Sequence, residues 1–154
     1  MSKSSLVRLE QQGAVAHIVL ARAQAHNAIN LALCEALQRA TAACATDPSI
    51  RAVVLRSEGP DFCVGGDLAE FGAYGQGRPE LVGALAAAFH AAERTLMTLR
   101  APVVVAVQGA AAGAGLGLAL CGTSLSPPRQ RASPWPTPRS ASRPTGDRPT
   151  SCRG

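Results

Sequence analysis

Residues 101–120 read APVVVAVQGAAAGAGLGLAL, and this stretch decides the fold class. It carries no charged side chain, so a membrane-spanning helix has to be considered. Pro102, Gln108 and four glycines make a single helix unfavourable, and the run of β-branched residues at 103–107 favours a strand. The stretch therefore predicts a buried strand, a glycine-rich turn and the start of a helix.

The residues before this stretch predict an alternation of strands and helices. The expected elements are strands at 6–10 and 15–20, a helix at 31–45 capped by Asn30, a strand at 52–55, a helical turn at 67–71, a helix at 79–99 and a strand at 103–107. Strands joined by helices pair in parallel through right-handed crossovers. We therefore expect an α/β fold in which residues 52–57 and 103–107 are parallel neighbours.

Composition and charge exclude several classes of protein. Hydrophobic residues make up 47% of the 154 residues, which is enough to build a core. The net charge of +5 is confined to the end of the chain, because residues 1–122 hold nine basic and nine acidic side chains. Residues 123–154 hold six arginines and one aspartate, but only one aromatic residue and no groove-reading element. Binding of nucleic acid or of an acidic partner is therefore the weakest of the functions considered.

The cysteines and the first residues of the sequence indicate the cellular compartment that we expect for the protein. The five cysteines form no CxxC pair, so neither a zinc site nor a disulfide framework is expected, and reduced thiols in a cytoplasmic protein fit better. Residues 1–5 lead into no apolar segment of the kind found in signal peptides. We expect no metal site and no membrane association.

The composition changes after Gly122. Residues 123–154 hold seven of the eleven prolines and ten Ser or Thr residues, and no helical or strand periodicity continues there. Such a segment cannot bury enough apolar surface to offset its chain entropy. The sequence therefore predicts a folded part at 5–122 and a disordered basic tail at 123–154.

Two glycine-containing loops that follow predicted strands are the candidate sites. Residues 61–68 (DFCVGGDL) can also be an ordinary strand-to-helix turn with Asp67 as the helix cap. Residues 108–118 open a helix, and its free N–H groups suit an anion. A phosphate loop there would need a lysine, yet no lysine follows Lys3, and the GxGxG spacing does not match a dinucleotide fingerprint. An oxyanion hole, the third possibility, needs only backbone donors.

Three motifs together resemble one family. Residues 62–68 (FCVGGDL) resemble the first oxyanion loop of the enoyl-CoA hydratase/isomerase (crotonase) superfamily, and residues 101–109 with the following glycines resemble the second. Residues 25–29 (AHNAI) are similar to the connector that lines the coenzyme A pocket. The resemblance covers roughly residues 5–122. It implies a partial, truncated crotonase ββα spiral core, and the disordered tail expected from composition follows this core.

The resemblance implies a role for each matching position. Val64 and Ala114 match the residues whose backbone N–H groups stabilise the oxygen of a thioester enolate. The positions that match coenzyme A contacts are Gln24, His26, Phe62, Gly66, Asp67, Leu68, Ala110 and Gly113. The implied partner is an acyl-CoA substrate, with no permanently bound cofactor. Members of the family are usually homo-oligomers.

The sequence departs from this family at its catalytic acids. Gly117 stands where the hydratases carry one glutamate, three residues after the second oxyanion donor, and the second glutamate falls in the tail. We expect Asp67 to be a cap rather than a base. Asp61 and Glu70 are expected to be solvated, and the three histidines, His17, His26 and His90, have no spacing that predicts a partner.

A shifted reading frame explains the tail. Read one nucleotide out of phase, the codons of residues 122–128 and 134–147 can encode DLVVAA and LAYTAIGLTPDGG, which resemble the stretch that follows this helix in the family. The sequence therefore predicts a frameshifted, truncated crotonase that lacks the assembly segments and exposes apolar helix faces. Its expected function is acyl-CoA chemistry of the hydratase/isomerase type, without hydratase turnover. The alternative is a non-catalytic acyl-CoA-binding remnant.

Overall fold

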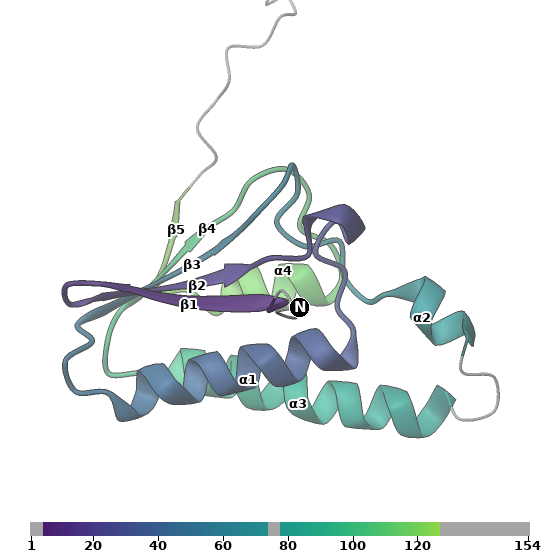
Figure 1. Ribbon diagram of the computed structural model, residues 1–154, viewed down its shortest axis with the longest axis horizontal. Helices are drawn as coiled ribbons and strands as arrows, with labels where there is room; N and C mark the ends of the chain where they lie inside the picture. The colour runs from purple at the N-terminus through teal and green to yellow at the C-terminus, as the bar shows by residue number, and fades with distance from the viewer. Residues whose placement is uncertain (1–4, 74–77, 127–154) are drawn as a thin grey trace, which may run out of the picture.

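A computed structural model describes residues 5–73 and 78–126 (Figure 1). Its centre is a five-stranded sheet in the order β1-β2-β3-β4-β5. The strands are β1 (Val7–Gln12), β2 (Val15–Leu20), β3 (Ala52–Ser57), β4 (Val103–Ala106) and β5 (Ser124–Ser126). β1 and β2 form an antiparallel hairpin, and every later neighbour pairs in parallel. The predicted α/β class and the parallel pairing of β3 with β4 are confirmed.

Helices make each parallel crossover. They are α1 (Leu31–Thr46), α2 (Leu68–Ala73), α3 (Arg78–Thr98) and α4 (Ala114–Leu120), with a short 3-10 turn η1 (Ala23–Ala25) before α1. α1 and α3 lie side by side below the sheet in Figure 1, and α2 projects to one side. Residues 101–120 form β4, a turn and α4, as predicted. Within residues 5–73 and 78–126, none of the helices has the length and apolar character needed to cross a bilayer.

Local sequence signals explain how α1 begins and which face it buries. Asn30 has an extended backbone, and its side-chain oxygen accepts a hydrogen bond from the Leu33 N–H at 2.9 Å, which is an N-cap. Leu33, Cys34 and Leu37 then follow at helical spacing and are fully buried. Each fully buried leucine contributes about 1.5–3 kcal/mol to folding.

Four cysteines pack in the interior as free thiols, which agrees with the sequence analysis; Cys152 lies outside the described residues. Burial raises the pKa of Cys34 to about 12 and that of Cys121 to about 11. These thiols are therefore protonated at neutral pH and act as small apolar side chains.

The sheet continues past Gly122, where the sequence analysis divides the chain. The Thr123 N–H donates to the Val103 carbonyl at 2.8 Å, its hydroxyl accepts from the Val103 N–H at 3.1 Å, and β5 then runs along β4. Backbone groups at an open sheet edge pair with a neighbouring segment whatever its composition, so composition did not reveal this strand. The rest of the predicted tail, 127–154, lies outside the described residues.

α4 exposes apolar side chains, as expected. Leu116 is 50% exposed and Leu120 is 63% exposed, while Leu118 on the opposite face is fully buried. α1, by contrast, turns polar and small residues outward. Exposed leucines on adjacent turns of one helix form an apolar patch that favours association with other apolar surfaces.

Candidate active site

The loops that follow β3 and β4 are hydrogen-bonded to each other. Because the two strands are parallel neighbours, both loops leave the same edge of the sheet. The N–H groups of Phe62 and Cys63 both donate to the Ala110 carbonyl at 3.1 Å, and the Ala112 N–H donates to the Cys63 carbonyl at 3.0 Å. The two candidate loops therefore lie against each other at this edge of the sheet.

Glycines allow this close approach. A Cβ on Gly115 would lie 2.2 Å from the Cys63 carbonyl oxygen, a distance that no side chain tolerates. Gly65 has φ +94, and a Cβ there would lie 2.9 Å from the Ala112 oxygen. Gly113 precedes α4 with φ +52. The loop after β3 can therefore contact the first turn of α4 only because these positions lack side chains.

The two expected oxyanion donors differ in this structure. Ala114 is the first residue of α4, and its N–H makes no hydrogen bond within the described residues. The Val64 N–H, in contrast, donates to the His26 carbonyl over a long 3.3 Å. A carbonyl oxygen that used both donors would therefore have to displace the His26 contact.

Asn27 holds the connector against the first loop, and the sequence analysis missed it. Its amide nitrogen donates to the carbonyls of Glu58 and Asp61, both at 2.9 Å, and its side-chain oxygen accepts from the Arg22 N–H at 3.0 Å. The side chain is fully buried and its φ is +54. Asparagine is one of the few residues that adopt this left-handed conformation readily. The asparagine in AHNAI was therefore the sequence signal that could have indicated a tight turn here.

His26 and Asp61 form a pair that the sequence analysis did not predict. The His26 Nδ1 lies 2.8 Å from Asp61 Oδ2, and Asp61 Oδ1 accepts from the Ala110 N–H at 2.8 Å. The Ala110 N–H, followed by His26, lowers the pKa of Asp61. We expected Asp61 to be solvated, and this expectation is wrong. Its carboxylate links the connector to both loops.

Arg22 forms a second link to the first loop. Its guanidinium lies 2.7 Å from Asp67 Oδ2, and both side chains are largely shielded from solvent. Asp67 Oδ1 also accepts from the Glu70 N–H at 3.0 Å, so the predicted helix cap is confirmed. The Glu70 N–H and then Arg22 lower the pKa of Asp67. The lowered pKa makes the Asp67 carboxylate a weaker base, and both of its oxygens already have partners.

The other predicted contact residues surround these loops. Gln24, His26, Leu68, Ala110 and Gly113 are exposed, and Gly66 is half-buried. Phe62 is different, because its side chain is fully buried in the core. No group of three His, Cys, Asp or Glu residues that could hold a metal occurs in the part of the chain that the structure describes.

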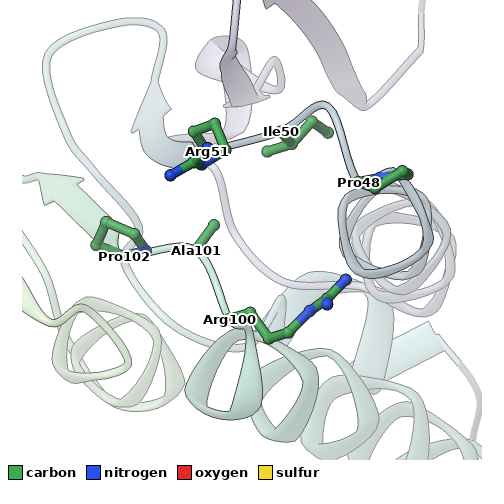
Figure 2. A pocket seen from close by; sticks show the side chains of 6 residues that line it. All are labelled: Pro48, Ile50, Arg51, Arg100, Ala101 and Pro102. Atoms are coloured by element: carbon green, nitrogen blue, oxygen red, sulfur yellow. The ribbon is translucent and has the colours of Figure 1, made fainter.

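A separate pocket lies at the other end of the strands. It has a volume of about 320 Å³ and is lined by Pro48, Ile50, Arg51, Arg100, Ala101 and Pro102 (Figure 2). Arg51 immediately precedes β3 and Pro102 immediately precedes β4, so the pocket opens where these strands begin. It is therefore not part of the paired loops, which lie where the strands end.

Comparisons with known proteins agree on one family. The sequence profile of enoyl-CoA hydratase/isomerase matches residues 10–123. An enoyl-CoA hydratase of Alternaria alternata is 36% identical over 110 residues, which cover 69% of this chain and 35% of that protein. A cyclohexa-1,5-dienecarbonyl-CoA hydratase of Thauera aromatica is 30% identical over 119 residues, covering 77% of this chain and 43% of that protein.

Solved structures agree with the sequence comparisons. The Pseudomonas aeruginosa protein PA4980 superposes with a TM-score of 0.75 at 40% identity, covering 82% of this chain and 54% of that chain. An enoyl-CoA hydratase from Polaromonas gives a TM-score of 0.72 at 31% identity, over 79% of this chain and 47% of that chain. The chain thus spans about a third to a half of the length of the relatives that it matches.

Proposed function

Since this chain belongs to the enoyl-CoA hydratase/isomerase family, we propose that its paired loops bind an acyl-CoA thioester and stabilise the enolate form of its carbonyl. The observation that carries the proposal is the free N–H of Ala114 beside a loop that is hydrogen-bonded to the start of α4. A donor aimed at a developing oxyanion is worth about 10²–10³ in rate. Val64 supplies the second donor once the long contact to His26 is displaced.

The connector and the loop edges supply the coenzyme A contacts in this proposal. Gln24, His26, Ala110 and Gly113 are exposed around the paired loops, and Leu68 is 81% exposed beside them. The His26–Asp61 pair and the Asn27 hydrogen bonds hold this edge in one arrangement before a ligand arrives. Such preorganisation lowers the entropy cost of binding.

The proposal does not include hydration of a double bond. Water addition needs a positioned base for the water as well as enolate stabilisation, and Gly117 offers no side chain for that role. We therefore expect enolate stabilisation without hydratase turnover. The alternative is a protein that binds acyl-CoA and stabilises no enolate, and the occupied Val64 N–H favours it.

Acetoacetyl-CoA separates the two functions, because its enolate absorbs in the near ultraviolet. Enolate stabilisation predicts an increase in this absorbance when the full-length chain is added, together with binding measured by calorimetry. Proline at Ala114 removes the donor, and proline is tolerated at the first position of a helix. The A114P variant should bind the enolate about 10²-fold more weakly.

The matched control is A114G, which keeps the N–H. It should retain the enolate absorbance, and circular dichroism should show that both variants keep the fold. Binding without any change in absorbance would favour the binding-only alternative. Absence of binding would contradict both functions.

A further inference from the structure

Glu93 of α3 lies directly against Gly117 of α4. A Cβ on Gly117 would lie 2.8 Å from Glu93 Oε1, so the carboxylate already occupies the space beside this glycine. Gly117 follows Ala114 by three residues on one helix, and residues at this spacing share a face. A carboxylate from a different helix therefore lies about one helical turn from the free Ala114 N–H.

The Glu93 carboxylate has no structural task in the described part of the chain. It is half-buried and makes no hydrogen bond or ion pair there. Burial raises its pKa, and His90 on the same helix opposes this increase. Cys121, the residue that follows α4, has a buried thiol, and Glu93 adds to the increase in its pKa that burial causes. An unpaired, partly desolvated carboxylate costs stability, which makes a functional role the better explanation.

We propose that Glu93 is the acid/base that removes and returns the proton next to the thioester carbonyl in the acyl-CoA site. The inference rests on the proposed function, because the proton that it moves belongs to the bound thioester. Its carboxylate removes a proton from the carbon next to the thioester carbonyl, and the electron pair of that C–H bond moves into the enolate. Glu93 then holds the proton and returns it to the same carbon or to the carbon two bonds further along a conjugated chain, so no oxidant or co-reactant is needed.

Hydrogen exchange of butyryl-CoA in deuterated buffer tests this role without requiring net turnover. The full-length protein should catalyse deuterium incorporation next to the thioester, read by mass spectrometry. E93Q keeps the size of the side chain and removes the base, so the exchange rate should fall by about 10²-fold or more. E93D should restore part of the rate. The rate should also rise with pH through a pKa above that of a solvated glutamate.

Two further variants separate a catalytic role from a structural one. E80Q changes an exposed glutamate at the start of α3 and should leave exchange unchanged. G117A places a methyl group against Oε1, and a flexible side chain can move away, so the fold should survive while exchange falls. E93Q should not lower the melting temperature, because it removes an uncompensated charge.

The outcomes distinguish this inference from the proposed function. Calorimetric binding of butyryl-CoA by wild type and E93Q alike, with exchange lost only in E93Q and G117A, would support Glu93. Binding without exchange in the wild type, or equal exchange in E93Q, would overturn the role of Glu93 and leave acyl-CoA binding intact. Absence of binding would overturn both proposals.

Discussion

The two ends of β3 and β4 differ in how their residues are held. Where the strands end, backbone hydrogen bonds join the two loops. The side chains of Asn27, Asp61 and Asp67 each form a hydrogen bond or an ion pair with a segment that is distant in sequence. Where the strands begin, Arg51 and Arg100 line an open pocket and make no side-chain hydrogen bond or ion pair with described residues (Figure 2).

This difference shows that an open pocket and a set of fixed hydrogen-bond donors lie at opposite ends of the strands. The pocket at the beginning of the strands has two long cationic side chains that make no hydrogen bond or ion pair with described residues, so nothing fixes where a ligand would sit. The opposite end has backbone donors held by glycines and by buried polar side chains. We therefore place the proposed acyl-CoA site at the end where the strands finish, because the sheet can position loops there.

The largest expected effect comes from the contact between α4 and the first loop. In G115A the new methyl group would overlap the Cys63 carbonyl, which is backbone and cannot move without separating the loops. We expect a loss of about 3 kcal/mol in the free energy of unfolding, or failure to fold. Urea denaturation measures it.

The control for this prediction is G83A in α3. A Cβ at Gly83 meets nothing within 4 Å, so this variant should gain about 0.5–1 kcal/mol through helix propensity. A small effect of G115A, similar in size to that of G83A, would show that the loops are not closely packed.

A smaller effect is expected from the Arg22–Asp67 pair. The pKa of Asp67 is lower in the folded protein than in the unfolded chain. The pair therefore stabilises the fold at pH values above the ordinary aspartate pKa of about 3.9. This stabilisation is lost as the pH falls through the lower pKa of the folded protein. D67N should reduce stability at pH 7 by about 1 kcal/mol and flatten the acid part of the stability curve. Thermal melts from pH 7 to pH 2.5 measure it.

The matched control is E70Q, in the same short helix. Glu70 makes no ion pair with Arg22, so the E70Q substitution should leave the acid part of the curve unchanged. An unchanged curve in D67N would mean that the pair contributes nothing to folding.

The smallest effect is expected at the beginning of the strands. R51A and R100A remove exposed side chains with no partner among the described residues, so each should change the free energy of unfolding by less than about 0.5 kcal/mol. Neither should alter acyl-CoA binding. A weaker affinity for butyryl-CoA in R51A or R100A would place part of the ligand at the pocket in Figure 2.

The sequence alone determined most of the elements and the position of the two candidate loops in the chain. Strand and helix periodicity, the cap at Asn30 and the glycines of both loops are local signals. They predicted parallel β3 and β4, each followed by a glycine-containing loop. The cap at Asp67 was likewise readable from its place before a helical turn. These features could be predicted because each depends on residues close together in the chain.

Only the tertiary structure decided which side chains meet. His26 pairs with Asp61, Arg22 with Asp67, and Glu93 lies against Gly117 through crossovers that join segments more than twenty residues apart. Strand β5 depends in the same way on the open edge of β4, and not on its own composition. Local propensity fixes backbone conformation, but the partner of a polar side chain depends on where two separate elements pack, which no short stretch of sequence encodes.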